Sequence, residues 1–453
     1  ACSRPSFPVR RAGEVPGCRS GAMTFSDTIV ALSSGALPSG VAVIRISGPE
    51  TSAVLEHLSI RAPEPRRLTL APLRIAGQLI DTGLVAWMPG PGSFTGEDTA
   101  ELQVHGSPAV VRALLRSIAA LPAVRLAGAG EFTRRAFLNG RLDLTEVEGL
   151  GDLIEAETET QRQQAVARLA GGLSQRIEGW RETLLDARAE IEARLDFSDE
   201  GDVAGELPAA VPAAIERLSG ELRDAIGSVG RGRIVREGLR VAIAGPPNVG
   251  KSSLLNALSR SDLAIVSDEP GTTRDVREVQ LDLSGRLVIL IDMAGLRATG
   301  SRAEAEGVRR AEAEIGRADL VLWLSAPDVA PLDPPLREPL WTVGTKSDLG
   351  PLRARYVLSV RDGTGVEELL AALAAFAAEA AGSGPPALVS RERDLEALSA
   401  AQTALDRFLS ERAVDEIAAE HLRQASLALE RLVGRIDTEQ VLDRLFASFC
   451  IGK

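Results

Sequence analysis

One eight-residue motif places the strongest constraint on the fold of this chain. The string GPPNVGKS at residues 245–252 fits the pattern G-x-x-x-x-G-K-S without a mismatch. It follows an apolar run typical of a strand and precedes a helical pattern, which is the context of a phosphate-binding loop. In such a loop, backbone N–H groups surround the phosphates and the helix N-terminus favours negative charge. We therefore expect Lys251 to contact the outer phosphates and Ser252 to bind Mg²⁺.

Length and composition set the class of protein. A chain of 453 residues corresponds to about three domains, and 45% hydrophobic with 25% charged residues is typical of a folded protein. The longest apolar tract, residues 369–381, is too short and too polar to span a bilayer. The three cysteines lie near the two ends and the three histidines are widely separated. These positions argue against a disulfide framework or a metal cluster and favour a reducing compartment.

The charge balance restricts how the chain could bind nucleic acid. A net charge of −12 argues against broad electrostatic coating of RNA or DNA. Two local basic patches remain, formed by Arg134, Arg135 and Arg141 and by Arg231, Arg233 and Arg236. Because aromatic residues make up only 3% of the chain, we expect any RNA contact to depend on shape and phosphates, or to be shared with a partner.

Lysine is rare in this chain. Of 51 basic residues, only Lys251, Lys346 and Lys453 are lysines. The other basic residues are arginines, so a general positive charge in this chain is normally supplied by arginine. We therefore expect each lysine to lie where a compact ammonium group is needed.

Patterning along the chain predicts four segments. Residues 1–22, rich in arginine and proline, are expected to be an unstructured leader or sequence upstream of Met23, with a transit peptide as the alternative. Residues 23–142 are predicted to form an α+β unit, with strands at 41–46 and 84–87 and a helix at 110–121. Apolar positions at helical spacing in residues 143–237 and 385–453 predict one helical domain. That domain is split by an insert, residues 238–384.

The insert alternates short apolar strands with helices. Strands are predicted at residues 239–244, 279–283, 287–291, 320–324, 340–343 and 356–358. Continuous apolar strands of this kind are typical of a mostly parallel sheet covered on both faces by helices. The predicted fold class is therefore α/β for the insert, beside the α+β and helical parts.

Two further motifs complete the phosphate side of the predicted site. The string GTTRD at residues 271–275 supplies a hydroxyl loop in which Thr273 is the natural second Mg²⁺ ligand. The string DMAG at residues 292–295 follows a predicted strand, and its acid and glycine are suited to sensing the γ-phosphate. Both lie in the order that a GTP-hydrolysing domain requires.

Two motifs predict the guanine side. The string TKSD at residues 345–348 offers the Asp348 carboxylate to the guanine amide edge, with the stem of Lys346 over the base. Ser359 and Val360, after the last strand, fit the loop whose backbone binds the guanine carbonyl. Such motifs more often begin with asparagine, so Thr345 is expected to loosen the positioning of the base slightly. Together the five motifs predict GTP binding.

The whole pattern resembles the MnmE (TrmE) family of tRNA-modification GTPases over residues 24–453. Outside the insert, the resemblance rests on the strings DTIV (27–30), VIRISG (43–48), PGPGSFTGED (89–98), GEFTRRAFLNGRLDL (130–144) and FCIGK (449–453). The terminal string is the most discriminating, because other GTPases with the same phosphate-binding loop lack it.

The resemblance implies a reaction and partners. Family members form homodimers through the N-terminal domain and act with the flavoprotein MnmG, which carries FAD, in a heterotetramer. Together they add a carboxymethylaminomethyl or aminomethyl group to C5 of the wobble uridine of certain tRNAs. A folate, 5,10-methylene- or 5-formyl-tetrahydrofolate, supplies the one-carbon unit. By positional match, the folate pocket of this chain would be lined by Arg45, Glu101, Arg141 and Lys453.

The resemblance also implies how GTP is hydrolysed. Family members use K⁺ instead of an arginine finger, which implies ligands from Asn248 and from Ser267, Glu269 and Thr272. Glu304 matches the glutamate that positions the attacking water, ahead of Glu306. Cys450 is either a packing residue or, with its thiolate favoured by Lys453, part of the modification chemistry.

The predicted nucleotide site can be stated in full. Its GTP-binding residues are Asn248, Val249, Gly250, Lys251, Ser252, Ser253, Ser267, Asp268, Glu269, Pro270, Gly271, Thr272, Thr273, Asp292, Met293, Ala294, Gly295, Thr345, Lys346, Ser347, Asp348, Ser359, Val360 and Arg361. We predict a cytoplasmic enzyme, or a mitochondrial one if residues 1–22 are a transit peptide. The alternatives are a ribosome-assembly GTPase switch and a folate-dependent aminomethyl transferase with a regulatory GTPase domain.

Overall fold

The computed structural model describes residues 25–452, with gaps at 62, 197–206, 266–277, 294–312, 314, 338, 412–414, 437–441, 443–444, 447–448 and 450. The chain divides into two compact units, residues 1–148 with 433–453 and residues 149–432. Within the described ranges, no helix is both long enough and apolar enough to cross a membrane. The four-segment division expected from the sequence stays a prediction.

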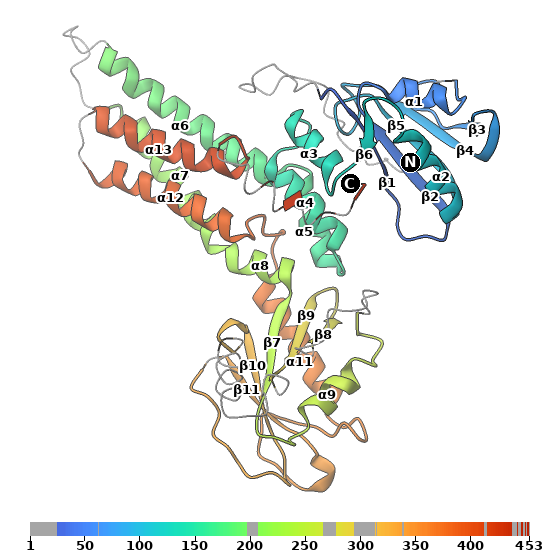
Figure 1. The fold of residues 1–453 in the computed structure, drawn as a ribbon. Helices are drawn as coiled ribbons and strands as arrows, with labels where there is room; N and C mark the ends of the chain where they lie inside the picture. The colour runs from blue at the N-terminus through green and yellow to red at the C-terminus, as the bar shows by residue number, and fades with distance from the viewer. Residues whose placement is uncertain are drawn as a thin grey trace, which may run out of the picture. The chain divides into compact units, whose positions relative to one another are not determined.

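The first unit contains a six-stranded mixed sheet (Figure 1). Its strand order is β3 (Thr69–Ile75), β4 (Gln78–Met88), β5 (Thr99–Gly106), β2 (Ser39–Ser47), β1 (Thr28–Leu32) and β6 (Val124–Leu126). Only β1 and β6 pair in parallel. Apolar side chains of α1 (Thr51–His57) and α2 (Pro108–Ile118) join those of the central strands in one buried core. A smaller cluster includes Phe132 of α3 (Glu131–Leu138). The predicted α+β character is confirmed.

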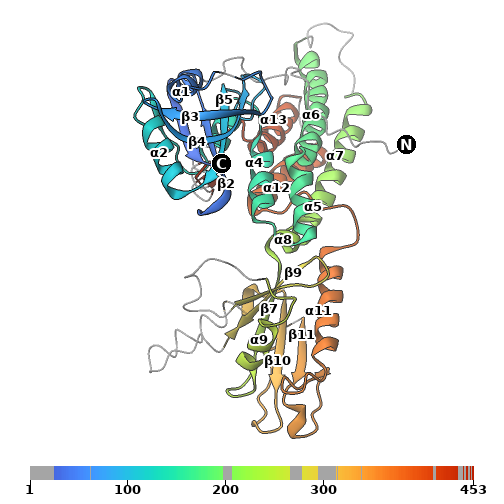
Figure 2. The same cartoon turned by 90° about the vertical axis from the view of Figure 1, so that its right-hand side faces the viewer.

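Helices from both sides of the insert form one bundle in the second unit (Figures 1 and 2). The helices are α4 (Leu144–Glu155), which begins in the first unit, α5 (Glu159–Leu169), α6 (Gly172–Asp196), α7 (Ala210–Gly227), α8 (Val229–Glu237), α12 (Glu392–Ser410) and α13 (Asp415–Leu432). α6 packs against α13, and α7 packs against α12. The predicted pairing of helical segments across the insert is therefore present.

A second six-stranded sheet lies between α8 and α12 in the sequence. Its order is β12 (Tyr356–Val357), β11 (Leu340–Gly344), β10 (Leu320–Ser325), β7 (Leu239–Ala244), β9 (Leu287–Asp292) and β8 (Glu278–Asp282). All neighbours are parallel except β8 and β9. Buried clusters lie on both faces, and one includes α9 (Lys251–Leu258) and α11 (Val366–Ala381). The six predicted strands and the mostly parallel sheet are confirmed.

A fully buried ion pair joins the two halves of the helical bundle. Arg168 of α5 donates to Asp394 Oδ2 of α12 at 3.1 Å, and neither side chain is exposed to solvent. Burial alone would raise the pKa of the Asp394 carboxyl. The charges of Arg168 and Arg393, with hydrogen bonds from Arg168 and the Ser390 N–H, outweigh that effect and hold the pKa below its usual value.

Replacing Asp394 with asparagine is expected to lower the free energy of unfolding by about 3–5 kcal/mol, because the buried Arg168 guanidinium would lose the carboxylate charge that lies 3.1 Å away. The pKa of Asp394 is lower in the folded chain, so its contribution is present above the unfolded carboxyl pKa of about 4 and is lost as the pH falls. Urea unfolding at pH 7 and pH 3 measures both effects. The Glu420→Gln change removes a carboxylate from a partly exposed surface ion pair with Arg423 and should alter stability far less. Equal effects of the two changes would contradict this account.

Candidate functional site

The phosphate-binding loop connects β7 to α9, as predicted. Gly245 has a φ of +141°, and a Cβ added there would lie 2.5 Å from the Leu324 carbonyl oxygen of β10. Gly250 precedes α9 with a φ of +101°. Only glycine fits both the open backbone angle and the close approach at Gly245. The loop therefore turns sharply and directs the N-terminus of α9 toward a cavity.

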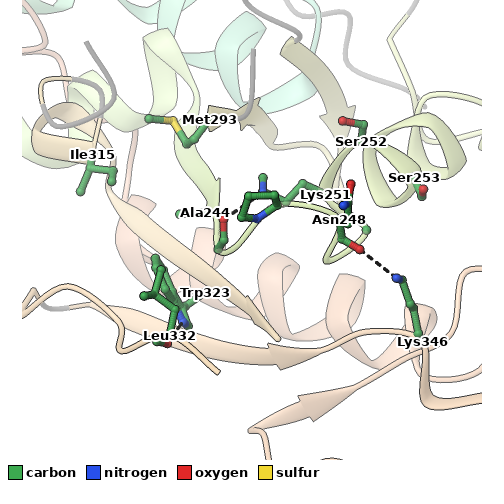
Figure 3. Close-up of a pocket in the computed structure, with 13 residues that line it drawn as sticks. Ala244, Asn248, Lys251, Ser252, Ser253, Met293, Ile315, Trp323, Leu332 and Lys346 are labelled. Carbon is green, nitrogen blue, oxygen red and sulfur yellow. Dashed lines mark hydrogen bonds between the residues drawn. The ribbon is translucent and has the colours of Figure 1, made fainter. Parts of the chain in front are cut away.

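Lys251 lies folded over this loop. Its ammonium Nζ donates to the carbonyl oxygens of Gly245 at 2.9 Å and Pro246 at 2.8 Å, and the residue is 7% exposed. The cavity beside it has a volume of about 590 Å³ and is lined by Asn248, Gly250, Lys251, Ser252 and Ser253, among others (Figure 3). A compact cation at a helix N-terminus is suited to binding a polyphosphate.

The Ser252 hydroxyl meets the end of β9 at the base of the cavity. Its Oγ donates to Asp292 Oδ2 at 2.8 Å, and Asp292 is 1% exposed. Hydroxyl and carboxylate oxygens are the ligand types that Mg²⁺ takes beside phosphates. The residues present therefore fit a magnesium ion bound to a nucleotide.

The residues predicted for guanine recognition lie on two neighbouring connections. Asp348, in the 3₁₀ turn Ser347–Leu349 after β11, accepts a hydrogen bond on Oδ1 from Ser359 Oγ at 3.0 Å. Arg361 Nη1 lies 3.7 Å from Oδ2 of the same carboxylate, and the Arg361 N–H donates to Ser359 Oγ at 3.3 Å. The structure thus brings the two predicted guanine loops together.

An apolar wall borders the phosphate loop, and sequence reasoning missed most of it. Met293, Ile315, Trp323 and Leu332 line the same cavity (Figure 3). The Trp323 Nε1–H donates to the Leu332 carbonyl oxygen at 3.2 Å. Of these four residues, the sequence predicts only Met293 at the site, because it belongs to the DMAG string. Trp323 lies in a continuous apolar strand, where nothing local distinguishes a cavity-lining residue from a core residue.

Several predicted site residues lie outside the described part of the chain. They are Ser267, Asp268, Glu269, Pro270, Gly271, Thr272, Thr273, Ala294, Gly295, Glu304, Glu306, Cys450 and Lys453.

The first unit brings together two residues predicted for folate binding. Arg45 of β2 contacts Glu101 of β5, with Nη2 2.9 Å and Nε 3.0 Å from Oε1. The Arg45 guanidinium also lies 5.7 Å from the ring centroids of both Phe94 and Phe132. The two side chains of the ion pair are 24% and 23% exposed. A half-buried cation and carboxylate beside aromatic rings can bind a flat polar heterocycle.

Arg141 is the third of these residues that the structure describes. A Cβ added at Gly96 would lie 3.4 Å from the Arg141 Cγ, so Arg141 lies beside the loop that carries Phe94. The Asn139 amide anchors that loop by donating to the Thr95 carbonyl oxygen at 2.7 Å.

The predicted basic patch around Arg134 needs correction. Arg135 is fully buried and makes ion pairs with Asp27 at 2.9 Å, Glu97 at 3.1 Å and Glu131 at 3.3 Å. Through these ion pairs, its guanidinium links α3 to the segment before β1 and to the loop that carries Glu97. It is not available to contact RNA.

The end of the sequence packs on the sheet of the first unit. Ile451 forms an isolated antiparallel bridge with Ala129, and the Gly452 carbonyl oxygen accepts a hydrogen bond from Ser33 Oγ. Gly452 has a φ of +100°, and a Cβ there would lie 2.1 Å from the Leu32 carbonyl oxygen. Glycine is thus required where this segment crosses the end of β1.

Comparisons with known proteins cover nearly the whole chain. The family model described as MnmE helical domain matches residues 144–450, and that described as GTP-binding protein TrmE N-terminus matches residues 28–141. The tRNA modification GTPase MnmE of Azorhizobium caulinodans is 51% identical over 437 residues, 94% of this chain and 99% of that protein. The protein of the same name from Rhizobium meliloti is 50% identical over 440 residues, 95% of this chain and 100% of that protein.

Two solved structures are similar to part of the chain. The G domain of the T. maritima FeoB iron transporter is 28% identical, over 31% of this chain and 99% of that chain, with a TM-score of 0.24. A variant of Era from Aquifex aeolicus bound to GDP and aluminium fluoride is 24% identical, over 39% of this chain and 69% of that chain, with a TM-score of 0.25.

Proposed function

Since the chain belongs to the MnmE family of tRNA modification GTPases, we propose that it couples GTP hydrolysis to the modification of wobble uridine. GTPase activity in tRNA modification follows from the family itself. The finer proposal is that, with the flavoprotein MnmG and its FAD, the protein adds a carboxymethylaminomethyl or aminomethyl group to C5 of that base in certain tRNAs. The observation that carries the GTPase part of this proposal is that Lys251 and Ser252 line one cavity, while the Ser252 hydroxyl donates to the buried Asp292 carboxylate.

Different residues around the cavity would bind different parts of GTP and its magnesium ion. The Asp348 carboxylate would accept the guanine N–H groups, and the Lys251 ammonium would exchange its loop carbonyls for phosphate oxygens. Ser252, with Thr273, would hold Mg²⁺, and a bound magnesium ion neutralises charge on the β- and γ-phosphates. Asp292, at 2.8 Å from Ser252 Oγ, would orient that hydroxyl.

We also propose that K⁺ assists hydrolysis. Asn248 lines the cavity, and its side-chain amide oxygen would be a ligand together with groups of Ser267, Glu269 and Thr272. A cation there would stabilise the charge that develops during phosphoryl transfer. Glu304 would position the attacking water.

The first solution test of this site is cation dependence. GTP turnover is expected to be at least about tenfold faster in K⁺ than in Na⁺ at equal ionic strength, because an electrostatic contact at the transition state would be lost. The Asn248→Ala variant should bind GTP but lose most of the difference between the two salts. Phosphate release in each salt measures this. Equal rates in both salts, or an unaltered K⁺ response in the variant, would contradict the assignment.

We propose that the N-terminal sheet binds the tetrahydrofolate donor. The contact between Arg45 and Glu101, flanked by Phe94 and Phe132, supports this assignment. Glu101 would accept the pterin N–H groups, while Arg45 and Arg141 would supply positive charge. The proposal includes Lys453 because the two residues before it contact this unit: the Ile451 backbone bridges to Ala129, and the Gly452 carbonyl oxygen accepts from Ser33 Oγ.

An exposed apolar surface supports the proposed homodimer. On the hairpin of β3 and β4, Leu70 is 69% and Leu84 is 37% exposed, and the two are register partners on one face. Leu68 and Leu79 on the same hairpin are also exposed. Exposed apolar side chains on a hairpin at a sheet edge are typical of an association site.

Reconstitution tests the proposed reaction as a whole. The protein, MnmG, an unmodified tRNA transcript, GTP, K⁺, Mg²⁺ and a methylene-tetrahydrofolate would be combined with glycine or ammonia. Mass analysis is expected to show the added group on the wobble uridine, and omission of GTP or folate should abolish it. Modification that proceeds equally without GTP would contradict the proposal.

A further inference from the structure

One of the three lysines lies between the two sides of the nucleotide cavity. Lys346, two residues after the end of β11, has a left-handed backbone with a φ of +54°. Its Nζ donates to the Asn248 carbonyl oxygen at 2.8 Å, a contact drawn in Figure 3, and to Asp328 Oδ2 at 2.7 Å. The ammonium group thus joins the guanine side of the site to the phosphate-binding loop, and Asp328 is its counter-ion.

Residues of the TKSD string contact the backbone of the phosphate-binding loop at two successive positions. Asn248 also has a left-handed conformation, with a φ of +62°, which is uncommon for a residue other than glycine. The neighbouring Val249 carbonyl oxygen accepts a hydrogen bond from the Thr345 hydroxyl, which also donates to the Ser325 carbonyl oxygen at 3.1 Å. Two successive residues of the TKSD string therefore hold two successive carbonyls of the loop.

The Thr345 contacts revise one sequence-based view. Thr345 is 2% exposed, and its hydroxyl ties the phosphate-binding loop to the end of β10. We expect threonine in place of the usual asparagine at position 345 to loosen the positioning of the guanine base. That expectation does not extend to the phosphate-binding loop. The loop beneath the base is anchored by Thr345 together with Lys346.

Asp328 belongs to none of the five nucleotide motifs. It lies in the connection between β10 and β11, and its side chain is 44% exposed while that of Lys346 is 30% exposed. The hydrogen bond from Lys346 is the largest cause that holds the pKa of the Asp328 carboxyl below its usual value. The acid is therefore ionised at neutral pH and paired with a lysine that is expected to cover the base.

We propose that Asp328 is a positioning residue for guanine-nucleotide binding, which holds the Lys346 ammonium against the Asn248 carbonyl. The inference rests on the proposed nucleotide site. With the ammonium fixed at two points, the aliphatic stem of Lys346 is ordered before the base arrives, and less side-chain freedom is lost on binding. Because the base is common to GTP and GDP, the contribution is the same for both nucleotides. It acts on affinity and not on the phosphoryl-transfer step.

The test compares two variants that each remove one carboxylate charge from the connection between β10 and β11. Asp328→Asn removes the counter-ion, and Asp333→Asn removes an exposed acid five residues away. Dissociation constants for fluorescent GDP and for a non-hydrolysable GTP analogue would be measured by titration, with kcat and KM for GTP in K⁺. Because exposed ion pairs contribute modestly, Asp328→Asn is expected to raise both dissociation constants and KM by the same factor, roughly two- to fivefold. The value of kcat should remain within about twofold, a change of under half a kcal/mol in the barrier.

Controls separate this role from a general charge effect. Asp328→Glu keeps the carboxylate and should recover most of the affinity, whereas Asp333→Asn should match the unaltered protein. If Asp328→Asn binds both nucleotides as tightly as Asp333→Asn does, the proposal is wrong. It is also wrong if kcat falls while affinity is unchanged, or if the two asparagine variants weaken binding equally. Failure of the unaltered protein to bind GDP would instead contradict the proposed function.

Discussion

The Lys251→Ala variant is expected to lose GTP binding and turnover together. The Lys251 ammonium is the charged donor inside the phosphate-binding loop, at 2.9 Å and 2.8 Å from two loop carbonyls, and it would exchange these for phosphate oxygens. Loss of a charged hydrogen bond from a desolvated site costs about 1.5–3 kcal/mol, or roughly a 10- to 150-fold weaker affinity. Turnover should fall further, because the same charge stabilises the transferred phosphoryl group.

A more demanding form of this prediction is that Lys251→Arg also fails. Arginine keeps the charge and is the usual cation of this chain, but its planar fork cannot take the place of a compact ammonium that fits between Gly245 and Pro246. Fluorescent-nucleotide titration and phosphate release measure both variants. Arg260→Ala, which removes an exposed cation just after α9, is the control and should behave as the unaltered protein. Near-normal turnover in Lys251→Arg would contradict the predicted need for lysine.

Removal of residues 450–453 is expected to abolish tRNA modification and to leave GTP hydrolysis nearly unaltered. None of the nucleotide motifs is touched by this deletion. It removes the segment that packs on the N-terminal sheet through Ile451 and Gly452, together with Cys450 and Lys453. We therefore expect weaker folate binding and a loss of modification beyond detection, with a GTPase rate within about twofold.

Point variants divide this effect between its causes. Lys453→Ala should weaken folate binding if the cation belongs to the pocket, while Cys450→Ser should spare folate binding and reduce modification if the thiol takes part in the chemistry. GTPase rate, folate titration and wobble-uridine analysis would be run side by side with MnmG present. Full modification by the truncated protein would rule out a role for these residues.

Local chemistry explains why the nucleotide site could be predicted. The phosphate-binding loop needs consecutive residues with defined backbone angles. Its motif can therefore be recognised from eight consecutive residues of the sequence. The strands of that sheet are buried on both faces and appear as continuous apolar runs. In contrast, β3 is an edge strand on which Leu73 alone is fully buried, so its pattern gives little sign of a strand.

Long-range contacts explain what the sequence could not give. Arg134 and Arg135 are neighbours on α3, yet one is exposed and the other buried, because successive helical residues point about 100° apart. Composition shows two arginines and does not show which of them faces the core. Likewise, Asp328 and Lys346 are 18 positions apart, with all of β11 between them, and they meet only in the fold. Phe94 and Phe132 are joined to Arg45 in the same way.

The central claim is that GTP hydrolysis by this protein drives modification of the wobble uridine. Its most direct test is mass analysis of wobble nucleosides in tRNA from cells that lack the protein, and from the same cells supplied with the unaltered chain or with Lys251→Ala. We predict that the C5 modification is absent without the protein, returns with the unaltered chain, and stays absent with Lys251→Ala. Wobble uridine that remains fully modified in cells lacking the protein would contradict the account.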